Sequence, residues 1–416
     1  MKTILIKGTD KGDVFIENGI IKEIGKISKQ ADKIINADGL KILPAFIDLH
    51  VHFREPGFEY KEDIESGSKS ASFGGFWAVC TMPNTNPPID KPELVKYQIQ
   101  RAKEIGLVDI FPIACATKGR EGKELSEYFL LFKAGAVGFS DDGNCILNTN
   151  VLRNALIYLK MFKLPIIQHS EDINLSLNYS AGWGFESLRD GLIGIPESAE
   201  ASVIARDSVL ALETGGWIHF SHISSKLSVE IIRYFKKLGA KITCDTTPHH
   251  LVLDYSYIKA NDYSPNFKMY PPLRSKHDIE ALWEGLIDNT IDAIATDHAP
   301  HELEAKLDFI EGERGIIGLQ TAFSVVYSEA IRRNLSLDFL IEKFVKFPVK
   351  FLKLSNVGEI KEGYKANLVL FDESKEWIFS PELIISKSKN SPFINKKLKG
   401  KVILTMKEGR ITYAED

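Results

Sequence analysis

Cysteine is scarce in this sequence, and its placement argues against two kinds of site. Only four cysteines occur among the 416 residues, far apart at Cys80, Cys115, Cys145 and Cys244. No CxxC spacing is present, so neither a disulfide framework nor a thiolate zinc site is indicated. Unpaired cysteines are typical of proteins in a reducing compartment, and we expect a cytoplasmic location.

Long apolar runs and an excess of basic residues are also missing. The N-terminal stretch MKTILIKGTDKGDVFIENG has three consecutive apolar residues before a charge, far fewer than a signal peptide needs, and no run reaches membrane-spanning length. The formal net charge is −4. We therefore expect neither a membrane nor a nucleic acid as partner, and a small molecule as substrate.

Glycine-rich phosphate-binding motifs are absent as well. No strand is followed by GxGxxG and no GxxxxGK[ST] occurs, which argues against a doubly wound nucleotide-binding sheet. Instead, residues 43–355 alternate short apolar strands such as FWAVCTM with amphipathic segments such as PELVKYQIQRAKEIG. Repeated strand-then-helix units predict parallel strands with helices outside, and eight of them close a (β/α)8 TIM barrel, here the catalytic domain.

The two ends of the chain have a different pattern. Residues 1–42 alternate apolar and polar side chains between Gly, Asn and Asp turns, which predicts short antiparallel strands. Residues 356–416 repeat that pattern in KANLVLFD, EWIFS, KVILTMKEG and RITYAED. We expect both ends to form one small composite β-sandwich domain beside the barrel.

Polar residues gather where the predicted barrel strands end, which is where TIM barrels carry their chemistry. Six strand ends supply them: His50, His52 and Arg54; Asn84; Asp141 and Asp142; His169; His222; Asp297, with His298 and His301 behind it. Several histidines and acidic residues on one rim predict a metal site. Because no cysteine belongs to the set, nitrogen and oxygen ligation is expected, which suits zinc, manganese or cobalt, and zinc is the default. Spacing alone does not choose between Asp141 and Asp142.

The other histidines have simpler interpretations. His219 is three residues from His222, so it faces the other side of its strand and is expected to be hydrogen-bonded in the interior. His249 and His250 follow a Thr-Thr-Pro turn and are expected to be loop or supporting groups. His298 is expected to be a hydrogen-bond partner of the site, and His277 a solvated loop residue.

Longer motifs carry a resemblance to a known family. They include DLHVHFREPGFEYKEDIESGSKSASFGGFWAVCTMPNTNP, VGFSDDGN, QHSED, HFSHISSK, TPHHL, PPLR, IATDHAPHELEAK, GIIGLQTAF and SKSKNSPF. Nearly end to end, the chain resembles the dihydroorotases of the longer bacterial and archaeal type, in the amidohydrolase superfamily. That resemblance implies that the protein interconverts L-dihydroorotate, the closed ring, and N-carbamoyl-L-aspartate, the open-chain form. This reaction belongs to de novo pyrimidine biosynthesis.

The resemblance also assigns residues. It implies one or two zinc ions, two expected, held by His50, His52, Asp142, His169, His222 and Asp297, with Asp142 bridging them. Arg54, Asn84 and His301 would contact the substrate carboxylate, and Asp297 would serve as general base and then acid. A homodimer is expected, and aspartate transcarbamoylase is a candidate partner.

Two features bear on the alternatives. Hydantoinases, dihydropyrimidinases and allantoinases usually place a carboxylated lysine where this chain has Ser140-Asp141-Asp142-Gly143, which weighs against them. In their favour, Tyr270 stands where dihydroorotases commonly have an asparagine that contacts the substrate ring. A further departure from the dihydroorotase pattern is Gln320, which stands where that family commonly has a glutamate. A non-catalytic subunit that scaffolds aspartate transcarbamoylase is a third reading, although all six ligands are present.

The segment HELEAKLDFIEGERGIIG at 301–318 directly follows the last ligand. It is highly charged and contains Gly312 and Gly315, which predicts a mobile loop. We expect this loop to close over the substrate and bring His301 toward it.

Overall fold

Eight parallel strands form the centre of the molecule. The structure is a computed structural model that describes residues 3–177 and 180–415. Neighbouring barrel strands pair in sequence order, as β6 (Phe46–Val51), β7 (Phe76–Thr81), β8 (Asp109–Cys115), β9 (Gly138–Ser140), β10 (Pro165–Gln168), β13 (Trp217–Phe220), β14 (Ile242–Thr246) and β15 (Ala293–Ile294). A parallel bridge between Val51 and His298 joins the two outer strands, so the sheet closes on itself. The predicted TIM barrel is confirmed.

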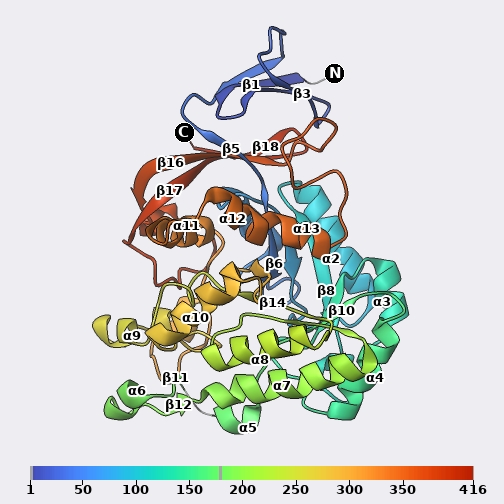
Figure 1. Ribbon diagram of the computed structural model, residues 1–416, viewed down its shortest axis with the longest axis vertical. Helices are drawn as coiled ribbons and strands as arrows, with labels where there is room; N and C mark the ends of the chain where they lie inside the picture. The colour runs from blue at the N-terminus through green and yellow to red at the C-terminus, as the bar shows by residue number, and fades with distance from the viewer. Residues whose placement is uncertain (1–2, 178–179, 416) are drawn as a thin grey trace.

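Helices surround this barrel (Figure 1). They are α1 (Ile64–Phe73), α2 (Pro92–Ile105), α3 (Tyr128–Ala134), α4 (Thr149–Leu159), α7 (Glu197–Thr214), α8 (Lys226–Lys237), α10 (Lys276–Ile287), α11 (Ala322–Arg332), α12 (Leu337–Ile341) and α13 (Phe347–Phe351). Short elements fill the longer connections: α5 (Ile173–Ser176), β11 (Ala181–Gly182), α6 (Phe185–Arg189), β12 (Gly194–Ile195) and α9 (Ser256–Ala260). The barrel strands β6 and β7 are buried along their whole length, as expected of strands covered on both faces.

Both chain ends build a separate β-structure above the barrel (Figure 1). One four-stranded sheet contains β1 (Thr3–Thr9), β2 (Gly12–Glu17), β3 (Ile20–Gly25) and β4 (Lys33–Asn36). The other contains β5 (Lys41–Pro44), β16 (Leu368–Ile378), β17 (Lys397–Lys407) and β18 (Arg410–Ala414). A shared apolar core includes Ile6, Val14, Leu368 and Met406, so the two ends stabilise one another. The small composite β-domain is confirmed, and its limits stay a prediction.

Three details differ from the sequence-based expectations. Strand β4 pairs with β1 in parallel, whereas only antiparallel pairs were expected at this end. The segments LVLFD and EWI form the single strand β16, because its pairing with β17 continues past an irregularity between Asp372 and Glu376. His277 lies in the first turn of helix α10 and is exposed, so its assignment to a loop is wrong.

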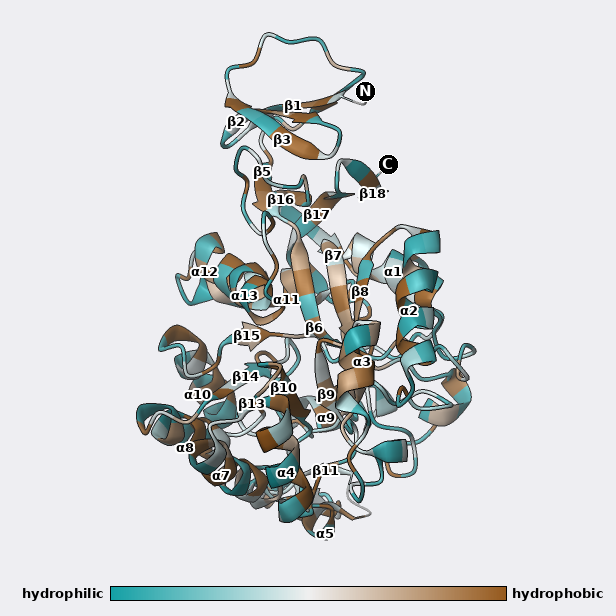
Figure 2. Cartoon of the chain, turned by 90° about the vertical axis from the view of Figure 1, so that its right-hand side faces the viewer, coloured by the Kyte–Doolittle hydropathy of each residue, from teal (hydrophilic) through white to brown (hydrophobic). Residues whose placement is uncertain are grey.

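The distribution of hydropathy follows the architecture. Figure 2 shows pale and brown stretches along the barrel strands, with teal at their polar residues, while the surrounding helices carry both brown and teal residues. One large buried cluster includes Phe46, Phe76, Phe139, Phe220 and Phe323, which come from the strands and from helix α11. Within the described residues, no helix is long and apolar enough to cross a membrane.

Candidate metal centre and substrate cavity

Two histidines at the end of β6 begin the candidate site. His50 lies in the strand and His52 follows it, with their Nε2 atoms 3.3 Å apart. Asp48 Oδ1 accepts hydrogen bonds from the N–H groups of His50 (3.1 Å) and Thr296 (3.0 Å). The N–H of His52 donates to the carbonyl of His298 at 2.9 Å. These bonds join the end of β6 to the chain after β15, so both imidazoles are fixed on the rim where Asp297 also lies.

The carboxylate of Asp142 lies among four histidines. Its oxygens are 3.5 to 3.7 Å from ring nitrogens of His50, His52, His169 and His222. These separations exceed ordinary hydrogen-bond lengths, and Asp142 Oδ1 is buried without a hydrogen-bond partner among the described residues. Asp141 turns elsewhere, since it accepts a hydrogen bond from the N–H of Thr117 at 2.9 Å. Of the two candidate aspartates, the structure brings Asp142 to the histidines.

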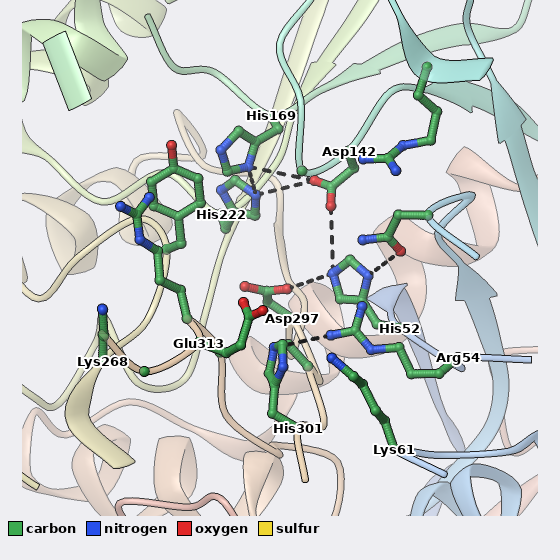
Figure 3. Close-up of a pocket in the computed structure, with 18 of the residues that line it drawn as sticks. His52, Arg54, Lys61, Asp142, His169, His222, Lys268, Asp297, His301 and Glu313 are labelled. Atoms are coloured by element: carbon green, nitrogen blue, oxygen red, sulfur yellow. Dashed lines mark hydrogen bonds and ion pairs between the residues drawn. The ribbon is translucent and has the colours of Figure 1, made fainter. Parts of the chain in front are cut away.

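Two overlapping sets of possible ligand atoms share Asp142. One set is His50, His52 and Asp142, and the other is Asp142, His169 and His222, with the ligand atoms of each set within 4.8 Å of one another. Asp297 adds an oxygen 3.2 Å from His52 Nε2 and 3.5 Å from His50 Nε2. Figure 3 shows His52, Asp142, His169, His222 and Asp297 pointing toward one another. Buried nitrogen and oxygen donors that converge without sulfur fit divalent metal ions.

Hydrogen bonds behind these side chains fix their orientation. The second ring nitrogen of His52 bonds to Asn84 Oδ1 at 2.8 Å, and His169 Nε2 lies 3.3 Å from Glu171 Oε2. Partners of this kind set which imidazole nitrogen is available to a metal. For His222 the bond is to the main chain instead, since its backbone N–H donates to Asp245 Oδ1 at 2.7 Å and so fixes the chain that carries the ring. Glu171 was not identified from the sequence, although its position two residues after His169 could have suggested it.

The electrostatics of the centre favour cations. Burial by itself lowers the pKa of His50, but the neighbouring carboxylates of Asp142 and Asp297 raise it to about 9. Burial raises the pKa of Asp297, yet the hydrogen bond with His52 and the charge of His50 hold it far below the usual range of a carboxyl group. Two carboxylates that remain ionised inside the protein attract positive charge strongly.

A second polar group lies beside the centre. The Arg54 guanidinium is buried and donates from Nε to the carbonyl of Pro300 and from Nη2 to His301 Nε2, both at 3.3 Å. Burial lowers the pKa of Arg54 to about 10, so the side chain stays charged at neutral pH. Burial and the charge of Arg54 lower the pKa of His301 to about 2, so this imidazole is neutral.

The tautomer of His301 follows from this contact. Because Nε2 accepts from Arg54, the proton lies on Nδ1, which is buried and has no hydrogen-bond partner among the described residues. A buried guanidinium that lines a cavity can bind a carboxylate through its paired N–H groups. Figure 3 shows both side chains at one end of the group of residues.

A cavity of about 700 Å³ joins the two groups. Its lining includes His52, Arg54, Asn84, Asp142, His169, His222, Asp297 and His301, so most of the predicted site residues meet in one space. Lys61, Arg120, Lys268, Glu313 and Arg314 also line it and were not predicted. The ring of Tyr270 also lines the cavity, with its centre 4.8 Å from the centre of the His169 ring. The guanidinium carbon of Arg314 lies 4.4 Å from the centre of the Tyr270 ring.

The remaining histidines support the scaffold. His219 bonds to Asp245 and Thr243, and His250 bonds to Thr247 and to the carbonyl of Pro271. His298 Nε2 lies 3.3 Å from a Glu62 oxygen, while its Nδ1 accepts from the N–H of Gly318. His249 is buried beside His250 and belongs to neither set of ligand atoms. These placements agree with their expected supporting roles.

Comparison with known proteins identifies the family. A family model described as dihydro-orotase-like matches residues 39–228. A dihydroorotase of Caldicellulosiruptor saccharolyticus is 44% identical over 408 residues, covering 97% of this chain and 94% of the relative. The chain belongs to the dihydroorotase family. A dihydroorotase of Aquifex aeolicus is likewise 44% identical, over 97% of this chain and 95% of its own length.

Comparison with solved structures shows that hydantoinases have a similar fold. An L-hydantoinase (dihydropyrimidinase) from Arthrobacter aurescens superposes with a TM-score of 0.86, covering 100% of this chain and 96% of the other at 22% identity. A D-hydantoinase (dihydropyrimidinase) from Thermus sp. gives a TM-score of 0.81, covering 99% of this chain and 95% of the other, also at 22% identity. At such low identity the likeness demonstrates the shared fold alone.

Proposed function

We propose that this protein is a metal-dependent dihydroorotase that interconverts L-dihydroorotate and N-carbamoyl-L-aspartate in de novo pyrimidine biosynthesis. The observation that carries the proposal is a single cavity with two ends. One end has the converging histidines and aspartates, and the other has the buried guanidinium of Arg54 beside His301. The substrate needs both, because it has a hydrolysable ring amide and a carboxylate. The full-length similarity to dihydroorotases agrees with this choice.

The proposed cofactor is zinc, with two ions per chain. His50, His52 and Asp297 would hold one ion, His169 and His222 the other, and Asp142 would be shared. Zinc is preferred because all the donors are imidazole nitrogens or carboxylate oxygens. Bound ions would lower the pKa of a water molecule and polarise the ring carbonyl.

Asp297 is the proposed proton carrier. Its carboxylate remains ionised in the site, so it can accept a proton from the attacking water. As the carbon–nitrogen bond of the ring breaks, the same proton would pass to the departing nitrogen. In the direction of ring closure, Asp297 would take the proton from that nitrogen and return it to the water that leaves.

Arg54, Asn84 and His301 are the proposed contacts of the substrate carboxylate. The guanidinium of Arg54 can bind two carboxylate oxygens with parallel N–H groups, and His301 lines the cavity beside it. Asn84 lines the same cavity while its Oδ1 is used by His52. A ring without a carboxylate would leave this buried charge uncompensated.

The segment 301–318 is proposed to close over the substrate. Several of its residues, among them Ile310, Glu313 and Arg314, line the cavity. Closure would exclude water from the reacting amide and strengthen the electrostatic contacts inside. Digestion of this loop by a protease should slow when the substrate or a product analogue saturates the protein.

Two further proposals concern the protein's surroundings. We propose a cytoplasmic location, which agrees with four cysteines that are all free of disulfides. We also propose a homodimer, with aspartate transcarbamoylase as a candidate partner. Light scattering of the protein alone, and then mixed with that enzyme, would test both assemblies.

A substrate panel tests the proposed function. Purified, zinc-loaded protein would be assayed with L-dihydroorotate, hydantoin, dihydrouracil and allantoin, each with and without a chelator. We expect hydrolysis of L-dihydroorotate alone, and loss of it with the chelator. Activity only on another ring would favour a dihydropyrimidinase, hydantoinase or allantoinase, the alternative suggested by Tyr270 in the sequence. Absence of activity on every ring, with metal bound, would favour a non-catalytic subunit.

A further inference from the structure

One side chain from the C-terminal part of the sequence bonds to the backbone of residues that line the cavity. Asn390 lies in the connection between β16 and β17, the long strands of the small domain, and its side chain is buried, with 4% of its surface exposed. Residues just before Asn390 contact the loop that follows β6. Ser388 Oγ donates to the carbonyl of Lys61, and Lys387 Nζ donates to the carbonyl of Glu59. This connection therefore packs against the loops that carry Arg54 and His301.

The Asn390 amide joins both ends of the loop 300–315. Its Nδ2 group donates to the carbonyls of Ala299 and Gly315, each at 3.0 Å, and its Oδ1 accepts from the N–H of His301 at 3.2 Å. Its backbone carbonyl accepts from the N–H of Ile317 at 2.9 Å. Both amide hydrogens and the amide oxygen are thus used, and all three bonds end on the backbone of this loop or of the residue before it.

The positions of Arg54 and His301 depend on the same stretch of backbone. The carbonyl of Pro300 accepts from Arg54 Nε, and the His301 ring accepts from Arg54 Nη2. Pro300 lies between Ala299 and His301, the two residues that Asn390 holds. A shift of this backbone would therefore move the guanidinium and the imidazole together.

We propose that Asn390 is a positioning residue that sets the geometry of the carboxylate-binding end of the cavity through the backbone of residues 299–301. The inference rests on the proposed function, because it assigns the carboxylate to Arg54 and His301. An amide suits the role because it offers two donors and an acceptor on a short side chain. Aspartate has the same shape, but it would place an oxygen without a hydrogen against the carbonyls of Ala299 and Gly315, so both of these hydrogen bonds would be lost.

The role predicts a particular kinetic signature. Removal of the Asn390 amide should weaken binding of the substrate carboxylate without removing any residue of the metal centre. The KM for L-dihydroorotate should then rise at least about tenfold, since small displacements of binding groups are costly, while kcat and bound metal change little. General destabilisation would instead reduce the amount of active protein and leave KM unchanged.

Gln320 offers a matched control. It is another buried amide that holds the same C-terminal connection, because its Nε2 donates to the carbonyl of Leu383 and its Oε1 accepts from the N–H of Ile385, both at 2.8 Å. Among the described residues, neither of these hydrogen bonds reaches residues 299–315. Gln320→Ala therefore removes a similar pair of hydrogen bonds without touching the base of the loop.

The experiment compares Asn390→Ala, Asn390→Asp and Gln320→Ala with the unchanged zinc-loaded protein. Measurements are metal content, kcat and KM for L-dihydroorotate, and amide hydrogen exchange across residues 299–317. We expect a raised KM and faster exchange in both Asn390 variants, and neither change in Gln320→Ala. If Asn390→Ala does not fold, Asn390→Asp supplies the same comparison, because it keeps the acceptor for His301 and loses both donors.

Two results would overturn the inference. One is an unchanged KM in folded Asn390 variants, and the other is the same rise in KM for Gln320→Ala. Failure of the proposed function looks different, since the unchanged protein itself would not hydrolyse L-dihydroorotate. The exchange measurement needs no substrate, so in that case unchanged exchange at 299–317 in the Asn390 variants would still contradict the positioning role, and faster exchange would still support it.

Discussion

The two ends of the cavity are built differently. At the metal end, His50, Asp142 and His222 come from the ends of barrel strands or the residues just after them, and buried hydrogen bonds hold them from behind. At the carboxylate end, Arg54 and His301 lie on loops. Those loops are held by other loops, including the connection that carries Asn390.

Under the proposed function, the metal end carries out the reaction and the carboxylate end selects the substrate. The barrel places the candidate metal ligands on one rim, and the hydantoinase structures share the same fold. Loops can change without disturbing the barrel, so they are where a preference for a carboxylate can be built. Substitutions at the metal end should therefore affect every substrate, whereas those at the carboxylate end should affect L-dihydroorotate selectively.

The largest effect is expected from Asp142→Ala. This change removes the carboxylate shared by both sets of ligand atoms, so bound metal and turnover of every ring should be lost. Metal analysis and activity assays on the folded variant would measure both. Asp141→Asn is the matched control, since Asp141 faces Thr117, and retention of metal by Asp142→Ala would contradict the assignment.

Asp297→Asn should reduce kcat by about a hundredfold to ten-thousandfold, the usual contribution of a proton-transferring group. The amide keeps the shape of the carboxylate but cannot accept the proton. Steady-state kinetics with metal content measured in parallel would separate loss of proton transfer from loss of metal. A variant that retained its metal and the original rate would show that another group carries the proton.

Arg54→Met should act on selectivity. Loss of the buried guanidinium should cost about 2 to 5 kcal/mol in the binding of L-dihydroorotate, since it removes one partner of a buried charged contact. Bound metal should not change. The measurement is kcat/KM for L-dihydroorotate, with Arg54→Lys as a variant that keeps the charge but loses the paired donors. Loss of metal in Arg54→Met would break the separation between the two ends.

The smallest effect is expected from Tyr270→Asn, which introduces the residue that the family resemblance leads us to expect at this position. The change removes the ring on which the Arg314 guanidinium rests, a contact of about 0.5 to 2 kcal/mol. We expect a severalfold rise in KM for L-dihydroorotate, because the loop that carries Arg314 is held less firmly. Improved turnover of L-dihydroorotate together with loss of another activity would instead identify Tyr270 as a determinant of a different substrate.

Much of the metal end could be predicted from the sequence. Parallel strands place their ends on one rim, so His50, His169 and Asp297 could be grouped before any contact was known. The choice between Asp141 and Asp142 could not be made from spacing, because it depends on which carboxylate Thr117 binds. The family resemblance supplied that choice, and the geometry agrees with it.

The carboxylate end was harder to predict. Arg54 was suggested by its place after His52, but Asn390 and Arg314 lie on segments without strand or helix periodicity. The contact of Asn390 with His301 joins residues 89 positions apart in the sequence. Such pairs depend on how loops pack, which hydrophobic patterns do not encode.

The most direct test of the account is a crystal structure of the zinc-loaded protein with L-dihydroorotate or a non-hydrolysable analogue. We predict the carboxylate on the Arg54 guanidinium, beside His301, and the ring amide against Asp142 and Asp297. A ligand bound with its carboxylate at Lys268 or Arg314, and with Arg54 making no contact, would contradict the division of the cavity into these two ends.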